Sequence, residues 1–197
     1  GRTLANGSRE FDGIRFQKLR AEIGEEIAAG QKRSRVSAND LQAYERFAKA
    51  TLSGEDASLL GWYHYNLQRF DMAKEWFSLA SDIEPNPKHL EGYVLSLRNL
   101  DELDTAEDLA YREYEDSPEL AKIYVELVAD RMNDPAVAAD LSVADLGRFQ
   151  TVVEDTRSAL GAQTLGWHLL EGDKIDEAGT WFEKSVVWDV TEEGVLG

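Results

Sequence analysis

The sequence predicts an all-α protein, a solenoid of about five antiparallel helix pairs. Three observations predict this fold. One segment of the chain recurs with its small and large apolar residues at the same positions. Side chains that favour helix starts precede most of the expected helices. No segment alternates apolar and polar residues between hairpin turns, as strands of an antiparallel sheet would.

The recurring segment is the strongest of these observations. Residues 60–77 (LGWYHYNLQRFDMAKEWF) align without a gap on residues 165–182 (LGWHLLEGDKIDEAGTWF), at a shift of 105 residues. That shift is close to three periods of about 34 residues, which is typical of a helical-hairpin repeat. The conserved positions are Leu60, Gly61, Trp62, Asp71, Ala73, Trp76 and Phe77, which recur as Leu165, Gly166, Trp167, Asp176, Ala178, Trp181 and Phe182.

The alternation of small and large residues explains how such hairpins pack. Gly61 and Ala73 lack bulk, so the two helices of one hairpin can approach closely. Phe77 and Trp76 then fill the space toward neighbouring helices, and we expect Trp76 and Trp181 in the core. One hairpin alone leaves an apolar face bare, so stability requires several stacked hairpins.

The expected helices cover most of the chain. Capping residues mark many starts: Ser37, Ser53, Ser142 and Asp173 each have an acid three residues on, and Asn86 and Ser117 each precede a proline. Gly54 and Gly172 are expected to end helices. The predicted ranges are 9–29, 38–52, 55–67, 70–83, 87–99, 102–115, 118–131, 143–157, 159–171 and 174–188.

These helices are expected to form a single solenoid over residues 1–197. The pair at 9–52 lacks the motif and is either a divergent repeat or a cap. Residues 55–118 hold two good repeats, 118–157 a degenerate one with a long connection around Pro135, and 159–190 another good one. The last residues, TEEGVLG, resemble the start of a further helix. With a start at Gly1 in place of Met, this suggests a segment excised from a longer protein.

Charge and composition exclude several classes of ligand. The 197 residues carry 21 Lys and Arg against 38 Asp and Glu, a net charge of −17. Phosphate backbones and anionic membrane surfaces attract clustered basic residues, so neither nucleic acid nor a membrane surface is an expected ligand. No apolar run is long enough for a membrane span. Without cysteine, disulfides and thiolate metal sites are impossible. The compartment stays undetermined, with the periplasm favoured over the cytoplasm.

No motif predicts an enzyme. His64, His89 and His168 lack zinc-site spacing, and phosphate-binding loops, the GxSxG elbow and calcium-loop spacing are absent. We therefore expect no catalytic residue, cofactor or metal. A glycosidase that uses two acids is the weakest alternative, because no carboxylate pair stands out among the 38 acids.

The repeat resembles the tetratricopeptide (TPR) family. Leu60-Gly61, Ala73-x-x-x-Phe77 and Pro85 fit that pattern, and 165–182 fits again. A middle copy keeps Ala106 and Pro118 but has Val94 in place of the glycine. The pattern's first Trp and its Tyr are replaced by Ala57 and His64, and later by Ala162 and Leu169. The resemblance implies a right-handed α-α superhelix whose first helices line a concave groove.

By that resemblance, the groove should hold a protein or peptide partner. A tryptophan at helical spacing usually packs in a core, so core packing is favoured for Trp62 and Trp167, with partner contact as the open alternative. Together with an acidic surround, an apolar and aromatic groove floor favours a partner with basic and apolar residues. The residues expected to bind it are Trp62, Tyr65, Asn66, Leu95, Arg98, Asn99, Trp167 and Glu171, and Gln163 and Leu170 map to the same face.

Three further expectations accompany this scaffold hypothesis. Residues 55–118 and 159–190 are similar to repeats of bacterial exopolysaccharide-secretion scaffolds, including the TPR subunit of cellulose export, which implies a periplasmic role between synthase and outer-membrane components. The alternative is a carbohydrate-binding module that stacks sugars on Trp62, Tyr65 and Trp167. Bare apolar end faces could also pair copies of the chain end to end.

Overall fold

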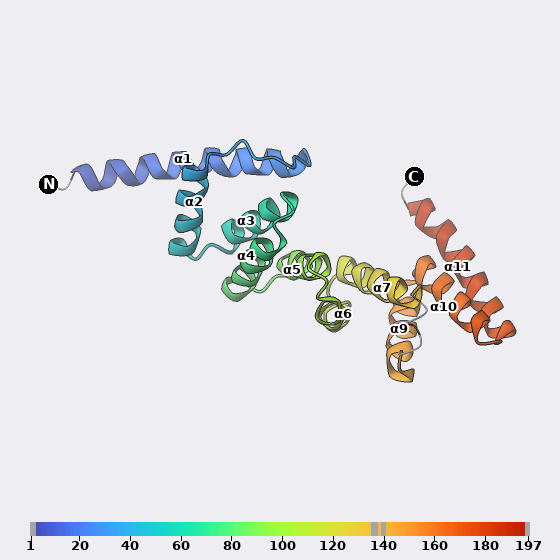
Figure 1. The fold of residues 1–197 in the computed structure, drawn as a ribbon. Coiled ribbons are helices and arrows are strands. Elements are labelled where there is room, and N and C mark those ends of the chain that lie inside the picture. Colours follow the sequence, from blue (N-terminus) through green and yellow to red (C-terminus); the bar gives the residue numbers. More distant parts are fainter. Residues whose placement is uncertain (1–2, 135–137, 139–140, 196–197) are drawn as a thin grey trace. The chain divides into compact units, whose positions relative to one another are not determined.

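A computed structural model describes the backbone of residues 3–134, 138 and 141–195, and the side chains of 14–134, 138 and 141–189. This part of the chain contains ten α-helices and no strand (Figure 1). The all-α prediction is therefore confirmed. The chain divides into two compact units, Gly1–Glu102 and Leu103–Gly197. That it forms one continuous solenoid stays a prediction.

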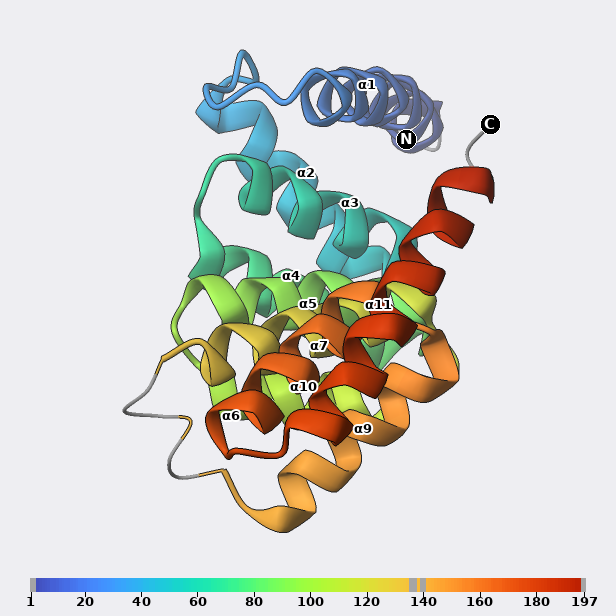
Figure 2. The same cartoon turned by 90° about the vertical axis from the view of Figure 1, so that its right-hand side faces the viewer.

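Unit 1 (Gly1–Glu102) is built around the hairpin of α3 and α4. The α5 helix packs against α4 and α3, and α1 packs chiefly against α3. Figures 1 and 2 show α1 crossing α2 at a steep angle, so this pair lacks the antiparallel arrangement expected of it. The helices are α1 (Thr3–Ala28), α2 (Ala38–Thr51), α3 (Gly54–Asn66), α4 (Phe70–Ile83) and α5 (Pro87–Asn99).

Local capping fixes where these helices begin. The Ser53 hydroxyl accepts a hydrogen bond from the Asp56 N–H at 3.1 Å, and Ser37 caps α2 in the same way. Asn86 caps α5, whose first residue is Pro87. These predicted starts are confirmed because each side chain satisfies an N–H group that the helix itself leaves unpaired. Gly54 was expected to end a helix, and that prediction is wrong: it is the first residue of α3.

The core of unit 1 is organised around the Phe77 ring, which is fully buried. A Cβ atom added to Gly61 of α3 would lie 2.7 Å from this ring, and one added to Gly92 of α5 would lie 2.3 Å from it. Both helices can therefore close on α4 only because these two positions lack a side chain. The expected close approach at Gly61 is confirmed, whereas the role of Gly92 was missed.

An ion pair between Arg20, which is partly exposed, and the buried Asp56 fastens α1 to α3. Both oxygens of the Asp56 carboxylate accept hydrogen bonds from the Arg20 guanidinium, at 2.6 and 2.7 Å, and Oδ1 also accepts from the Tyr44 hydroxyl at 2.5 Å. Burial alone would raise the pKa of Asp56, but the bonds from Arg20 and Tyr44 outweigh it and lower that pKa. Phe16 and Ile23 of α1 are buried in one apolar cluster with Tyr44 of α2 and Leu60 of α3.

Unit 2 (Leu103–Gly197) ends in a second hairpin of the same type. A Cβ on Gly166 of α10 would meet the Phe182 ring of α11 at 2.6 Å, as at Gly61 and Phe77. Figures 1 and 2 show α10 and α11 side by side, while α7 packs against α6, α9 and α10. The helices are α6 (Leu103–Arg112), α7 (Pro118–Met132), α9 (Val143–Thr156), α10 (Ala159–Glu171) and α11 (Ile175–Val195).

Most predicted helix ends in unit 2 are confirmed. Ser117 caps α7, Ser142 and Asp145 form a complete capping box on α9, and Gly172 follows the last residue of α10. Asp173 is a correction, because it has a φ of 58° and lies two residues before α11 begins.

The end of α11 is a second correction. Residues 191–195, expected to start a new helix, continue α11 to Val195. The predicted connection around Pro135 lies largely outside the described residues. Trp76 and Trp181 are 4% and 8% exposed, so their predicted place in the core is confirmed.

Candidate functional site

Three of the predicted residues meet on neighbouring helices of unit 1 and form what we call the α3–α5 patch: Trp62, Tyr65 and Asn99. The Trp62 and Tyr65 rings lie edge to face with centroids 5.7 Å apart. The Asn99 amide of α5 donates to the Tyr65 hydroxyl of α3 at 3.1 Å and to the Leu95 carbonyl at 2.8 Å. These contacts hold the patch in one arrangement before any partner arrives.

Trp62 also belongs to the packing of its own hairpin. Its ring meets Phe77 edge to face at 4.9 Å, and Tyr65 in turn meets Phe70 at 5.3 Å. Both Trp62 and Tyr65 are partly buried. The Trp62 side chain therefore packs within its own hairpin and is also partly accessible at the surface.

The other residues predicted in unit 1 are placed differently. The Asn66 side-chain amide donates to the backbone carbonyl of Gln31, so it holds the connection between α1 and α2. Leu95 and Arg98 are partly buried on α5, beside Asn99. That these three residues also meet a partner stays a prediction.

In unit 2 the predicted residues lie on α10. Trp167 is 55% exposed, although its ring meets Phe182 edge to face at 5.2 Å. Glu171 follows one turn later and is exposed, as is Leu170. Leu160 is exposed seven residues before Trp167 and therefore falls on the same helical face. We call Leu160, Trp167, Leu170 and Glu171 the α10 stripe.

The surroundings of the two tryptophans differ at one repeat position. Trp62 and Trp167 occupy equivalent positions of the repeat and make the same contact with a phenylalanine. Beside Trp62, however, stands Tyr65, whereas the equivalent residue beside Trp167 is Leu170. Leu170 is itself 38% exposed, so the larger apolar surface remains on α10.

Sequence reasoning missed two features near the predicted binding residues. Leu160 could have been found from its seven-residue spacing to Trp167. The connection at residues 29–37 holds three basic and no acidic residues, and it is fastened to α3 through Asn66 and through the hydrogen bond from Tyr63 to Ser34. Sequence spacing gives no signal for these two hydrogen bonds, because one joins residues 29 positions apart and the other joins residues 35 positions apart.

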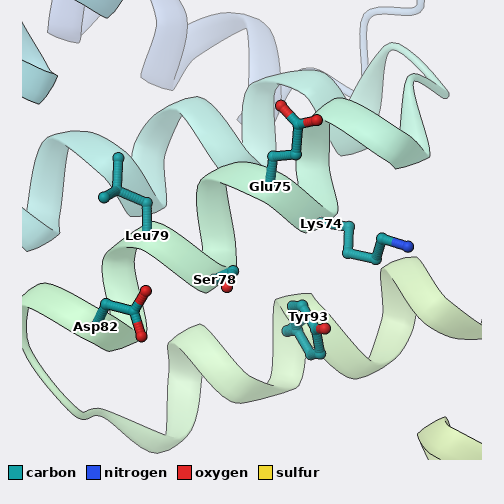
Figure 3. A pocket seen from close by; sticks show the side chains of 6 residues that line it. All are labelled: Lys74, Glu75, Ser78, Leu79, Asp82 and Tyr93. Atoms are coloured by element: carbon teal, nitrogen blue, oxygen red, sulfur yellow. The ribbon is translucent and has the colours of Figure 1, made fainter.

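A shallow, open pocket lies elsewhere on unit 1, between α4 and α5 (Figure 3). Lys74 at its edge donates to Glu102 at 2.6 Å, so its charge is already compensated. None of the predicted binding residues takes part in it. The lining residues are Lys74, Glu75, Ser78, Leu79, Asp82 and Tyr93.

His64 has structural surroundings. His64 is fully buried, its Nε2 lies 3.2 Å from a Glu45 carboxylate oxygen, and burial together with the nearby Arg69 charge lowers its pKa to about 4. Where the structure describes side chains, no three His, Asp or Glu residues are grouped closely enough to hold a metal ion. None of the described helices is both long and apolar enough to cross a bilayer.

Comparison with known proteins identifies the fold. The sequence matches no protein-family model and no curated protein sequence. Its structure is similar to the crystal structure of MamA, with a TM-score of 0.57 over 79% of this chain and 90% of that chain, at 17% sequence identity. MamA is a TPR-like helical solenoid. At this identity the likeness concerns the fold alone, and the chain has a TPR-like helical fold.

Proposed function

We propose that this TPR-like protein is an interaction scaffold that holds a segment of a partner protein against its first helices. The observation that carries the proposal is the α10 stripe, where a tryptophan and two leucines are exposed on one helical face. Exposed apolar patches of this kind mark interaction sites, and tryptophan is enriched among the residues that dominate binding energy.

The α3–α5 patch supports the same proposal. Its aromatic side chains are held by edge-to-face contacts and by the Asn99 hydrogen bond, so little side-chain freedom would be lost on binding. It lies on α5 and on α3, which is the first helix of the α3–α4 hairpin, as α10 is the first helix of the α10–α11 hairpin. Each unit thus offers one surface built from the same repeat position.

Selection of displayed peptides tests the proposal. A random peptide library is selected on the immobilised full chain, and the affinity of each recovered peptide is then measured for Trp167→Ala, Trp62→Ala and Val143→Ala variants. Val143 is the control because it is 88% exposed but lies at the start of α9, outside the helices that carry the proposed binding surfaces.

Loss of a tryptophan at the centre of a peptide site should weaken binding by about tenfold or more. We expect peptides that depend on Trp167 or Trp62 and are indifferent to Val143. Recovering no peptide, or only peptides that ignore both tryptophans, would contradict the scaffold function.

A narrower form of the proposal concerns pathway. The likeness of residues 55–118 and 159–190 to repeats of exopolysaccharide-secretion scaffolds suggests a periplasmic place between synthase and outer-membrane components. A glycosyltransferase gene beside the parent gene, and co-purification of its product with this chain, would support that form. Their absence would leave the general scaffold function in place.

Carbohydrate binding is the second candidate, and the exposure of Trp167 is the observation that favours it, because sugars stack on exposed aromatic rings. Oligosaccharides titrated against tryptophan fluorescence would give a saturable change that disappears in Trp167→Ala. An unchanged signal through millimolar sugar would remove this candidate.

A further inference from the structure

The net charge of the protein is concentrated in one unit. Unit 2 (103–197) has 7 Lys and Arg against 22 Asp and Glu, a net charge of −15. Unit 1 (1–102) has 14 against 16, a net charge of −2. The two units carry similar repeats, so the repeat itself does not require this difference.

The exposed apolar stripe and exposed carboxylates coincide at the end of α10. Glu171 belongs to the stripe, and Asp173, Asp176 and Glu177 follow within six residues, against one lysine, Lys174. All four acids are exposed, and none of them makes an ion pair with another described residue. The last carbonyl groups of α10 add partial negative charge at the same end.

The dimensions of the stripe limit what can occupy it. Leu160 and Glu171 are 11 residues apart on one helix, which corresponds to about 16 Å, or three turns of a partner helix. Leu160, Trp167 and Leu170 present apolar surface along that length, and the carboxylates lie at one end. An occupant therefore needs an apolar side and positive charge beside it.

We propose that the α10 stripe is the docking surface for a cationic amphipathic helix of about three turns, with leucine-like side chains against Trp167 and Leu170 and Lys or Arg against Glu171 and its neighbours. This inference rests on the scaffold function proposed above and assigns the chemistry of the partner. Charge complementarity carries it: a carboxylate-rich rim raises the rate of encounter with a basic partner and disfavours an acidic one.

Three labelled 18-residue peptides test the inference by fluorescence anisotropy on the full chain. The first is an amphipathic helix of Leu and Lys. In the second Glu replaces every Lys, and in the third Ser replaces every Leu. We expect measurable binding of the first alone, with an affinity that falls as salt is raised, because exposed charges are screened.

Variants locate the binding on α10. Glu171→Lys and Glu115→Lys change the net charge equally, but Glu115 lies in the turn between α6 and α7. Glu171→Lys should weaken binding of the Leu–Lys peptide by about tenfold and Glu115→Lys by less than about twofold. Trp167→Ala should weaken it by about tenfold, and Trp167→Phe, which can keep the ring contact with Phe182, by less.

The outcomes separate this inference from the scaffold function. Equal effects of Glu171→Lys and Glu115→Lys, or binding of the Glu-containing peptide as tight as that of the Lys-containing one, would overturn the inference. If displayed peptides still depended on Trp167, the scaffold function would stand although the inference about a cationic helix had failed. If neither displayed nor synthetic peptides depended on Trp167 or Trp62, both would fall.

Discussion

Replacing Gly92 by alanine should destabilise unit 1, although alanine is the better helix former. At an open helical position the exchange gains about 1 kcal/mol. At Gly92 the new Cβ would stand 2.3 Å from the fully buried Phe77 ring, which Gly61 of α3 also approaches so closely that a Cβ there would lie 2.7 Å from it. Overpacking of this kind costs about 1–3 kcal/mol. Because 2.3 Å is far inside van der Waals contact, the cost should exceed the gain, and we expect a net loss of up to about 2 kcal/mol.

Urea unfolding and hydrogen exchange of the full chain measure this loss and locate it. Gly24→Ala is the matched control in the same unit, because a Cβ there meets no atom within 4 Å, and it should leave stability unchanged or higher. Faster exchange is expected in α3, α4 and α5 of Gly92→Ala, with α10 and α11 unaffected.

A double mutant tests the cause. In a Phe77→Leu background the smaller side chain leaves room for the Cβ, so the cost of Gly92→Ala should shrink. The reasoning would be refuted if Gly92→Ala proved as stable as Gly24→Ala, or if its cost were the same with and without the Phe77 ring.

Two further predictions concern buried ionisable groups in unit 1. Asp56→Asn should cost about 1–3 kcal/mol, because an amide N–H would face the Arg20 donors, and it should speed hydrogen exchange in α1 while leaving α10 unchanged; equal exchange in α1 would contradict the proposed fastening. The lowered pKa of Asp56 adds stability above the ordinary carboxyl pKa that is lost as pH falls through the lowered value. His64, with a pKa lowered from 6.5 to about 4, stays neutral in the fold, so stability should be full above pH 6.5 and fall by up to about 3 kcal/mol toward pH 4 as the unfolded chain takes up a proton. His64→Gln should remove this part of the pH dependence of urea unfolding, and an unchanged slope would show that the burial of His64 is not its source.

The sequence alone was sufficient for the helices and for their repetition. Seven of the ten predicted ranges agree with the structure to within two residues at both ends, because helix starts depend on local groups such as Ser53, Asn86 and Ser142. The repeat at a shift of 105 residues also predicted which small residue would lie against which ring, as Gly61 and Phe77 do. Three ranges differ by more than that: α1 begins at Thr3, α6 ends at Arg112 where 115 was predicted, and α11 continues to Val195. Gly7, Gly13 and Gly194 are poor helix formers, yet α1 and α11 continue through them.

Only the tertiary structure decided which residues of the predicted site are surface and which are structural. The Asn66 side chain binds the backbone of Gln31, 35 residues earlier in the chain. Gly92 of α5, which lies outside the α3–α4 hairpin, closely approaches the Phe77 ring of α4. Trp62 and Trp167 occupy the same position of the repeat and cannot be told apart by motif. In the structure, Trp62 packs beside Tyr65, which is bonded to Asn99, whereas Trp167 is 55% exposed. The physical reason is that a helix cap depends on a few adjacent residues and a repeat is visible as a pattern in the sequence. The exposure of a side chain, in contrast, depends on every helix that packs near it.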